Sequence, residues 1–109
     1  MTNIKLGAFN AEKFQDSASK AAALLRALSN EKRLMILCRL SSGEFSVGEL
    51  QKDFTISQSA FSQHLAILRA EGLVGTRRES QTIYYSISDP AALRVIETLA
   101  SIYCPEMLI

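Results

Sequence analysis

The sequence predicts a mainly α-helical, α+β domain in which four helices are followed by a two-stranded hairpin and one last helix. Three observations lead to this fold class: apolar residues recur at helical spacing, polar capping residues precede the helical stretches, and β-branched and aromatic residues gather around residue 80. A length of 109 residues suits one compact domain. We expect that domain to span residues 15–109 and to follow a loosely ordered segment, residues 1–14.

The first two predicted helices lie between about Gln15 and Gly43. The first runs to Leu28 and carries two apolar stripes. A small domain seldom supplies partners for two apolar faces, so the second stripe predicts contact with another subunit. Asn30 is a favourable N-cap for the second helix, which Gly43 ends. The two stripes of the first helix are Ala18, Ala21, Ala22, Leu25 and Leu28, and Ala23, Leu24 and Ala27.

Two short capped segments follow. Ser46 and Glu49 have the spacing of a capping box and open a short helix that ends near Phe54. Ser57 is the N-cap of the next helix, and Gly72 is its left-handed stop. Only two residues separate these segments, so the sequence predicts a helix, a tight turn and a second helix.

After Gly72 the apolar pattern changes its period. The runs 73–78 and 82–87 surround a polar break at 79–81, which is typical of a β-hairpin. Alternation along the second run predicts that Ile83, Tyr85 and Ile87 face inward, and that Thr82, Tyr84 and Ser86 face outward.

The last helix is predicted to begin after Asp89, with Pro90 as its first residue. It carries two apolar stripes, one for the domain and one for a partner, so we expect a homodimer formed through the first and last helices. The stripes are Leu93, Ile96, Ala100 and Tyr103, and Val95, Leu99 and Ile102.

Helix, turn, helix and hairpin together are typical of a winged helix-turn-helix, which binds double-stranded operator DNA. The second helix of the motif has a face of small polar side chains that can enter a major groove, and Gln58 or Gln63 can bond to adenine. We expect His64 and Arg69 to contact the DNA backbone and the hairpin to add two arginines. The candidate DNA-binding residues are Ser57, Gln58, Ser59, Ser62, Gln63, His64, Arg69, Arg77, Arg78 and Gln81.

The overall charge limits this interpretation. Lys and Arg number 12 against 11 Asp and Glu, so the chain is not a strongly basic nucleic-acid binder. Five cations in residues 20–39 can supply a distributed footprint, and tight binding then requires two copies on two half-sites. An ordinary solvated polar face stays an alternative. These cations are Lys20, Arg26, Lys32, Arg33 and Arg39.

Other classes of protein fit less well. A thiol hydrolase could pair a cysteine with His64, but no Gly-rich phosphate loop, nucleophile elbow or carboxylate pair accompanies it. A winged helix that only binds other proteins is a further alternative. No apolar stretch approaches the ~20 residues of a membrane span and no signal peptide is evident, so we expect a cytoplasmic protein without membrane contact.

The segments GELQKDFTISQSAFSQHLAILRAEGLV and RRESQTIYYSI closely resemble the helix-turn-helix and wing of the ArsR/SmtB family of bacterial repressors. The resemblance covers about residues 20–104. It implies a dimer formed through the first and last helices, and an operator read by the second helix of the motif. Many relatives sense metals through a Cys-x-Cys pair or through ligands on the last helix. Residues 46–49 here read SVGE and the last helix has no His, so we expect no metal and no cofactor, with a metal-responsive repressor kept as an alternative.

The two cysteines instead resemble those of the BigR, SqrR and HlyU branch, which senses sulfane sulfur or oxidants. That resemblance implies that Cys38 and Cys104 are a redox-sensing pair, which persulfide, polysulfide or an oxidant joins so that DNA affinity falls. The alternative is that Cys38 is a small core residue and Cys104 an incidental thiol.

Overall fold

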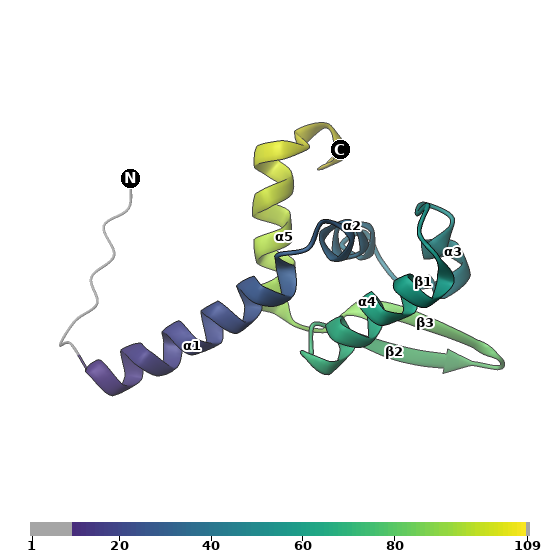
Figure 1. The fold of residues 1–109 in the computed structure, drawn as a ribbon. Coiled ribbons are helices and arrows are strands. Elements are labelled where there is room, and N and C mark those ends of the chain that lie inside the picture. Colours follow the sequence, from purple (N-terminus) through teal and green to yellow (C-terminus); the bar gives the residue numbers. More distant parts are fainter. Residues whose placement is uncertain (1–9, 109) are drawn as a thin grey trace.

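The computed structural model describes residues 10–108 and contains the predicted order of helices and hairpin strands, with one additional short strand (Figure 1). The predicted α+β fold class is therefore confirmed. The elements are α1 (Ala11–Leu28), α2 (Glu31–Leu40), β1 (Phe45–Ser46), α3 (Val47–Gln51), α4 (Gln58–Ala70), β2 (Val74–Glu79), β3 (Thr82–Ile87), α5 (Pro90–Tyr103) and the 3-10 turn η1 (Pro105–Leu108).

The helix starts follow the capping residues. The Asn30 side chain accepts hydrogen bonds from the backbone N–H groups of Lys32 and Arg33, at 2.9 and 3.1 Å. Both bonds of the Ser46–Glu49 capping box are present. Local hydrogen bonds of this kind satisfy free N–H groups at helix ends, and for this reason the sequence predicts these starts well.

The first helix begins earlier than predicted. α1 starts at Ala11, where Asn10 accepts a hydrogen bond from the backbone N–H of Lys13 at 3.0 Å. Residues 11–14 are therefore helical, and the expectation of a loose segment reaching residue 14 was wrong for them. The first turns are exposed and polar, so apolar periodicity could not reveal them. Residues 1–9 lie outside the described part of the chain.

Two helices end earlier than predicted. α2 stops at Leu40, and the chain turns before Gly43, whose N–H donates to the Leu40 carbonyl at 3.2 Å. After α3 the N–H of Phe54 donates to Gln51 at 3.0 Å, three residues back. Both segments end in tight turns with hydrogen bonds three residues apart, not with α-helical bonds. The helices are therefore shorter, and the loops after them longer, than apolar spacing alone predicts.

The sheet has three antiparallel strands in the order β1-β3-β2. The hairpin register pairs Arg77 with Tyr84, and the two-residue loop places Ser80 at a φ of 59°. β1 was not predicted, because it has two residues and pairs with a strand about forty residues further along the chain. A strand of two residues is too short to show the alternation of apolar and polar residues that predicts a strand.

The core lies between α2 and the elements around it. Its largest fully buried side chains are Phe61, Ile36, Leu37, Leu50, Leu68 and Ile96. Tyr85 and Ile87 pack against this core, as their inward positions on β3 predict. Ile83 is half-buried but is not among the residues packed against the core, because it lies near the tip of the hairpin.

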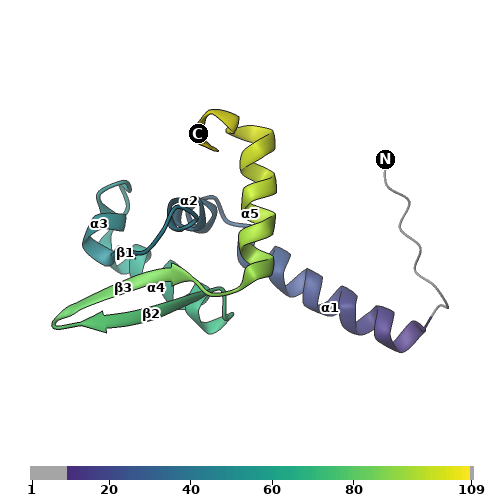
Figure 2. The same ribbon diagram turned by 180° about the vertical axis from the view of Figure 1, so that it is seen from behind.

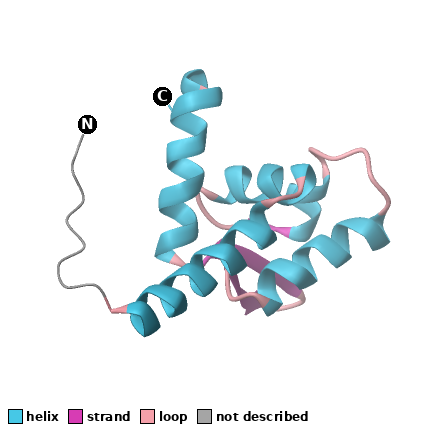
Figure 3. Ribbon diagram, turned by 60° about the vertical axis from the view of Figure 1, so that its left-hand side comes forward, coloured by secondary structure: helices cyan, strands magenta, loops and turns pink. Residues whose placement is uncertain are grey.

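The described chain is elongated, with extents of 51 × 31 × 24 Å. α1 extends away at one end and the hairpin tip at the other (Figures 1 and 2). Helices form most of the molecule, and the small sheet is partly hidden behind them in Figure 3. Leu25 on α1 and Ile102 on α5 are each 60% exposed, so these two apolar side chains have no partner within the described residues that buries them.

Candidate nucleic-acid interface and thiol pocket

The polar face of α4 is exposed. α4 buries Phe61, Leu65 and Leu68 against the core. Ser59, Ser62 and Gln63 are exposed, and none of these side chains is bulky. The helix therefore presents a polar surface of short side chains, which can enter a major groove.

The N-terminus of α4 adds backbone donors to this face. The Ser57 hydroxyl accepts a bond from the N–H of Ala60 at 3.2 Å and lies 3.3 Å from the hydroxyl of Ser59. Gln58, the first residue of the helix, is exposed. The helix dipole and the remaining free N–H groups favour an anion such as a phosphate at this end.

His64 lies apart from the exposed face of α4. It is half-buried, and its Nδ1 atom is enclosed without a hydrogen-bond partner among the described residues. Burial lowers the pKa of His64, and the nearby positive charges of Arg33 and Lys32 on α2 lower it further. His64 therefore lies near two positive charges of α2, and its contact with the DNA backbone stays a prediction.

The two wing arginines have different surroundings. Arg77 donates to both carboxylate oxygens of Glu44 at 3.0 and 2.8 Å and to Glu79 at 2.9 Å, and its guanidinium stacks on Tyr84 at 4.8 Å. Arg78 and Gln81 are exposed, and Arg78 makes no ion pair within residues 10–108. Arg77 thus stabilises the wing against the segment before β1, while Arg78 is the wing cation available to a phosphate.

Two of the cations expected to extend the positive footprint have internal partners. Arg33 donates to the Ala27 and Arg26 carbonyls at the end of α1, at 2.7 and 3.3 Å. Arg39 pairs with Asp53 at 3.0 Å and stacks on Phe45 at 4.3 Å. Of these two cations, Arg39 is paired with an opposite charge, whereas Arg33 keeps its charge beside neutral carbonyl groups.

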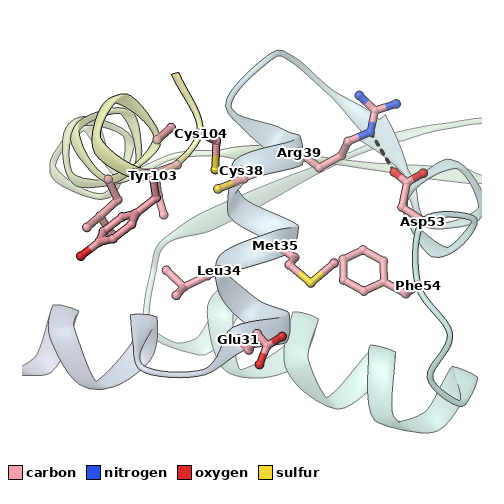
Figure 4. A pocket seen from close by; sticks show the side chains of 12 residues that line it. Glu31, Leu34, Met35, Cys38, Arg39, Asp53, Phe54, Tyr103 and Cys104 are labelled. Atoms are coloured by element: carbon pink, nitrogen blue, oxygen red, sulfur yellow. Dashed lines mark hydrogen bonds and ion pairs between the residues drawn. The ribbon is translucent and has the colours of Figure 1, made fainter. Parts of the chain in front are cut away.

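A second candidate site is a pocket of about 710 Å³ between α2, the loop after α3 and the end of α5 (Figure 4). Its lining is almost entirely apolar, and both cysteines belong to it. The lining residues are Glu31, Leu34, Met35, Cys38, Arg39, Asp53, Phe54, Ile96, Leu99, Ala100, Tyr103 and Cys104.

The two thiols come from elements that pack on each other. Cys38 lies in the last part of α2, and Cys104 is the C-cap of α5, where its N–H donates to the Ala100 carbonyl at 2.8 Å. Figure 4 shows the two sulfur atoms beside one another. Both cysteines are unbridged and half-buried. The fold thus brings together the two residues expected to form a pair.

The environment of Cys38 favours the neutral thiol. Burial raises the pKa of Cys38, and the adjacent Cys104 raises it further, because two thiolates repel each other. The electrostatic influence of one cysteine on the other agrees with their proximity in Figure 4. Because a protonated thiol reacts slowly, Cys38 is protected from indiscriminate attack at neutral pH.

The metal-responsive alternative would need several ligands gathered among the residues that the structure describes. No group of three or more His, Cys, Asp and Glu side chains comes together there. No helix in the same part of the chain is long and apolar enough to cross a bilayer.

Comparison with protein families identifies residues 30–76 as a match to the model of the bacterial regulatory protein, arsR family. The transcriptional activator HlyU of Vibrio cholerae serotype O1 is 46% identical over 104 residues, which cover 95% of this chain and 96% of HlyU. The chain belongs to the ArsR family. Within it, similarity is high to the branch that contains HlyU and BigR. The chain is thus a DNA-binding transcriptional regulator, and the proteins it resembles are regulators and not enzymes.

Solved structures agree with this assignment. Reduced HlyU from Vibrio cholerae has a TM-score of 0.81 and 48% identity, and the match covers 85% of this chain and 98% of that one. The transcriptional repressor BigR from Xylella fastidiosa has a TM-score of 0.78 and 40% identity, covering 88% and 98%. The predicted ArsR-family winged helix-turn-helix is thereby confirmed.

Several residues of the sites escaped the sequence interpretation. Glu44 holds Arg77 from 33 positions away, and Asp53 holds Arg39 from 14 positions away. Met35 and Phe54 complete the pocket from different elements. No local sequence signal joins such residues, because only the packing of α2, α3 and the sheet brings them together.

Proposed function

We propose that this regulator binds operator DNA as a homodimer and that a bond between Cys38 and Cys104 lowers its DNA affinity. Persulfide, polysulfide or an oxidant would form that bond. The observation that carries the proposal is that the two thiols, 66 positions apart in the sequence, line one pocket, where Cys104 contributes to the raised pKa of Cys38. A solved relative described as reduced HlyU is consistent with redox chemistry in this branch.

In the reduced state, α4 enters the major groove with its exposed serines and glutamines, and Arg78 and Gln81 extend along the backbone. Each protomer occupies one half-site, so the separation of the two α4 helices must match about one turn of DNA. The residues proposed to contact DNA are Ser57, Gln58, Ser59, Ser62, Gln63, Arg69, Arg78 and Gln81.

The switch joins α2 to the end of α5. An oxidant accepts two electrons and two protons from the thiols, and one sulfur–sulfur bond replaces two S–H bonds. Because α5 also carries the outer apolar stripe proposed for the dimer, fixing its end to α2 changes the separation of the two α4 helices. If the bridged form binds DNA about 1.4 kcal/mol less favourably than the reduced form, its affinity is tenfold lower.

The test uses Cys38→Ser and Cys104→Ser beside the unaltered protein, with an operator fragment in a gel-shift assay. We expect all three reduced proteins to bind equally, and only the unaltered protein to lose affinity, by about tenfold or more, after polysulfide treatment. Reduction with dithiothreitol should restore its binding. A loss of affinity that persists in both serine variants contradicts the role of the pair.

A further inference from the structure

The volume of the pocket that contains the two thiols is much greater than the space that a direct bond between them requires. A volume of about 710 Å³ lies within the range of sites for small organic molecules. Direct thiol–thiol contact requires no such space. The pocket therefore has room for the body of a reagent beside the reacting sulfur atoms.

The lining of this pocket selects for an uncharged reagent. Most of it is apolar, with Leu34 and Met35 from α2, Phe54 from the loop after α3, and Leu99 from α5. Its charged groups are two carboxylates and one guanidinium. The guanidinium, Arg39, is paired with one of the carboxylates, Asp53, which leaves Glu31 as the uncompensated charge. An anionic reagent loses its hydration in such a pocket without gaining a cation.

We propose that this pocket binds the apolar substituents of an uncharged organic trisulfide, R–S–S–S–R, and that the bound trisulfide is the reagent that bridges Cys38 and Cys104. The inference rests on the proposed switch and names the class of molecule that operates it. A sulfur chain is itself apolar, and its thiolate leaving groups depart without an acid to protonate them.

The reaction balances without a further oxidant. One cysteine thiolate attacks the central sulfur and releases the first R–S⁻, and the second cysteine thiolate attacks the same sulfur and releases the other. The two R–S⁻ groups take up the two cysteine protons as R–SH. The product is Cys–S–S–S–Cys, so the thiols lose two electrons and the trisulfide accepts them. An additional sulfur atom also relaxes the distance that a simple disulfide requires.

Binding compensates for the low reactivity of the thiols. Burial and the neighbouring Cys104 raise the pKa of Cys38, which lowers the fraction of its thiolate at neutral pH. A reagent that accumulates in the pocket reacts faster in spite of this, because its local concentration is higher.

The experiment measures the rate of bridge formation in the full-length reduced protein, with mass spectrometry to count the retained sulfur. Dimethyl, diethyl and dipropyl trisulfide are compared with glutathione trisulfide, which has the same reactive bond but carries charged groups. Each rate is divided by that of the same reagent with N-acetylcysteine. We expect this ratio to rise by up to about fourfold for each methylene group that becomes buried, and to be lowest for glutathione trisulfide.

Substitution of Met35, which is 41% exposed, tests whether the pocket is responsible. Met35→Trp fills the pocket and should lower the dipropyl trisulfide rate by about tenfold, with little change for dimethyl trisulfide. Met35→Ala, the matched control, should keep the dependence on chain length. Operator binding by the reduced variants verifies that they fold. If a variant does not fold, the comparison of the four reagents on the unaltered protein still tests the inference.

The outcomes separate the two proposals. Normalised rates that are equal for all four reagents, or highest for glutathione trisulfide, overturn the apolar-reagent inference and leave the cysteine switch intact. A lack of bridging by all four trisulfides, in a protein that polysulfide still bridges, also overturns only the trisulfide inference. A bridge that forms without loss of operator binding overturns the switch itself.

Discussion

At the scale of single residues, the central feature is the neutral state of Cys38. Its half-buried position in α2 and the adjacent Cys104 both favour the thiol over the thiolate. A neutral thiol suits a sensor that must stay reduced until a specific reagent arrives, because the thiolate is the reactive form.

This environment predicts a pH profile. The pH-dependent rate of Cys38 alkylation should have its midpoint above that of an ordinary thiol. Cys104→Ser should move the midpoint down but not to the ordinary value, because burial is the larger cause of the raised pKa. Iodoacetamide labelling followed by mass spectrometry gives both midpoints. An unchanged midpoint in Cys104→Ser contradicts the coupling.

The same shift affects folding stability in a definite direction. Folded Cys38 holds its proton to a higher pH than the unfolded chain does, so between the ordinary thiol pKa and the raised one the folded state binds more protons. The free energy of unfolding should therefore fall as pH rises through that interval, and Cys38→Ser should weaken this fall.

At the scale of elements, the wing combines a fixed and a free arginine. Arg77 is held by Glu44 and Glu79, and the Arg77 hydrogen bond lowers the pKa of Glu44. This contact links the middle of β2 to the chain before β1, so it orients the hairpin. Arg78 follows in the same strand without such a restraint among the described residues.

We predict that Arg78→Ala lowers operator affinity mainly through its electrostatic component. The slope of log K against log salt concentration should decrease by about 0.9 for each phosphate that Arg78 neutralises in the complex. Lys13→Ala is the control, because Lys13 lies near the start of α1, away from α4 and the hairpin (Figure 1). Fluorescence anisotropy across a salt series measures both slopes. Equal slopes for Arg78→Ala and the unaltered protein would exclude a phosphate contact at this position.

At the scale of the whole molecule, α2 connects the proposed thiol switch to the DNA-binding elements. It packs against α5 on one side and α4 on another. A covalent tie between α2 and the end of α5 would therefore act together on the helix proposed to form the dimer and on the support of α4.

A bridge should stabilise the fold while it weakens DNA binding. It would close a loop of about 65 residues, which removes chain entropy from the unfolded state and corresponds to at most about 4 kcal/mol. Urea denaturation of reduced and bridged protein measures this change. A bridged form that is less stable than the reduced form indicates that affinity falls through unfolding and not through a change of geometry.

The proposed dimer depends on the exposed apolar stripes. Ile102→Asp should give a monomer in sedimentation velocity and reduce operator affinity by at least about tenfold, because a charge would replace an apolar contact and the protein would occupy only one half-site. Ser101→Asp adds the same charge at the adjacent exposed position and should leave the dimer intact. A dimeric Ile102→Asp protein would locate the interface elsewhere.

The order of the helices and hairpin could be predicted from the amino-acid sequence alone, because caps such as Asn30, Ser46 and Ser57 act on N–H groups within three residues. Helical spacing also indicated the polar face of α4. The prediction for the start of α1 was wrong, because polar exposed turns carry no apolar period.

Which distant residues meet depends on the tertiary structure. The pairing of β1 with β3, the hydrogen bonds between Arg77 and Glu44, and the enclosure of the His64 Nδ1 atom all require packing between segments far apart in the chain. The same is true of the thiol pocket: the cysteines were identified by resemblance, but their shared apolar site exists because α5 packs across α2. Local spacing fixes hydrogen bonds and faces within an element, whereas contacts between elements depend on how the complete core excludes water.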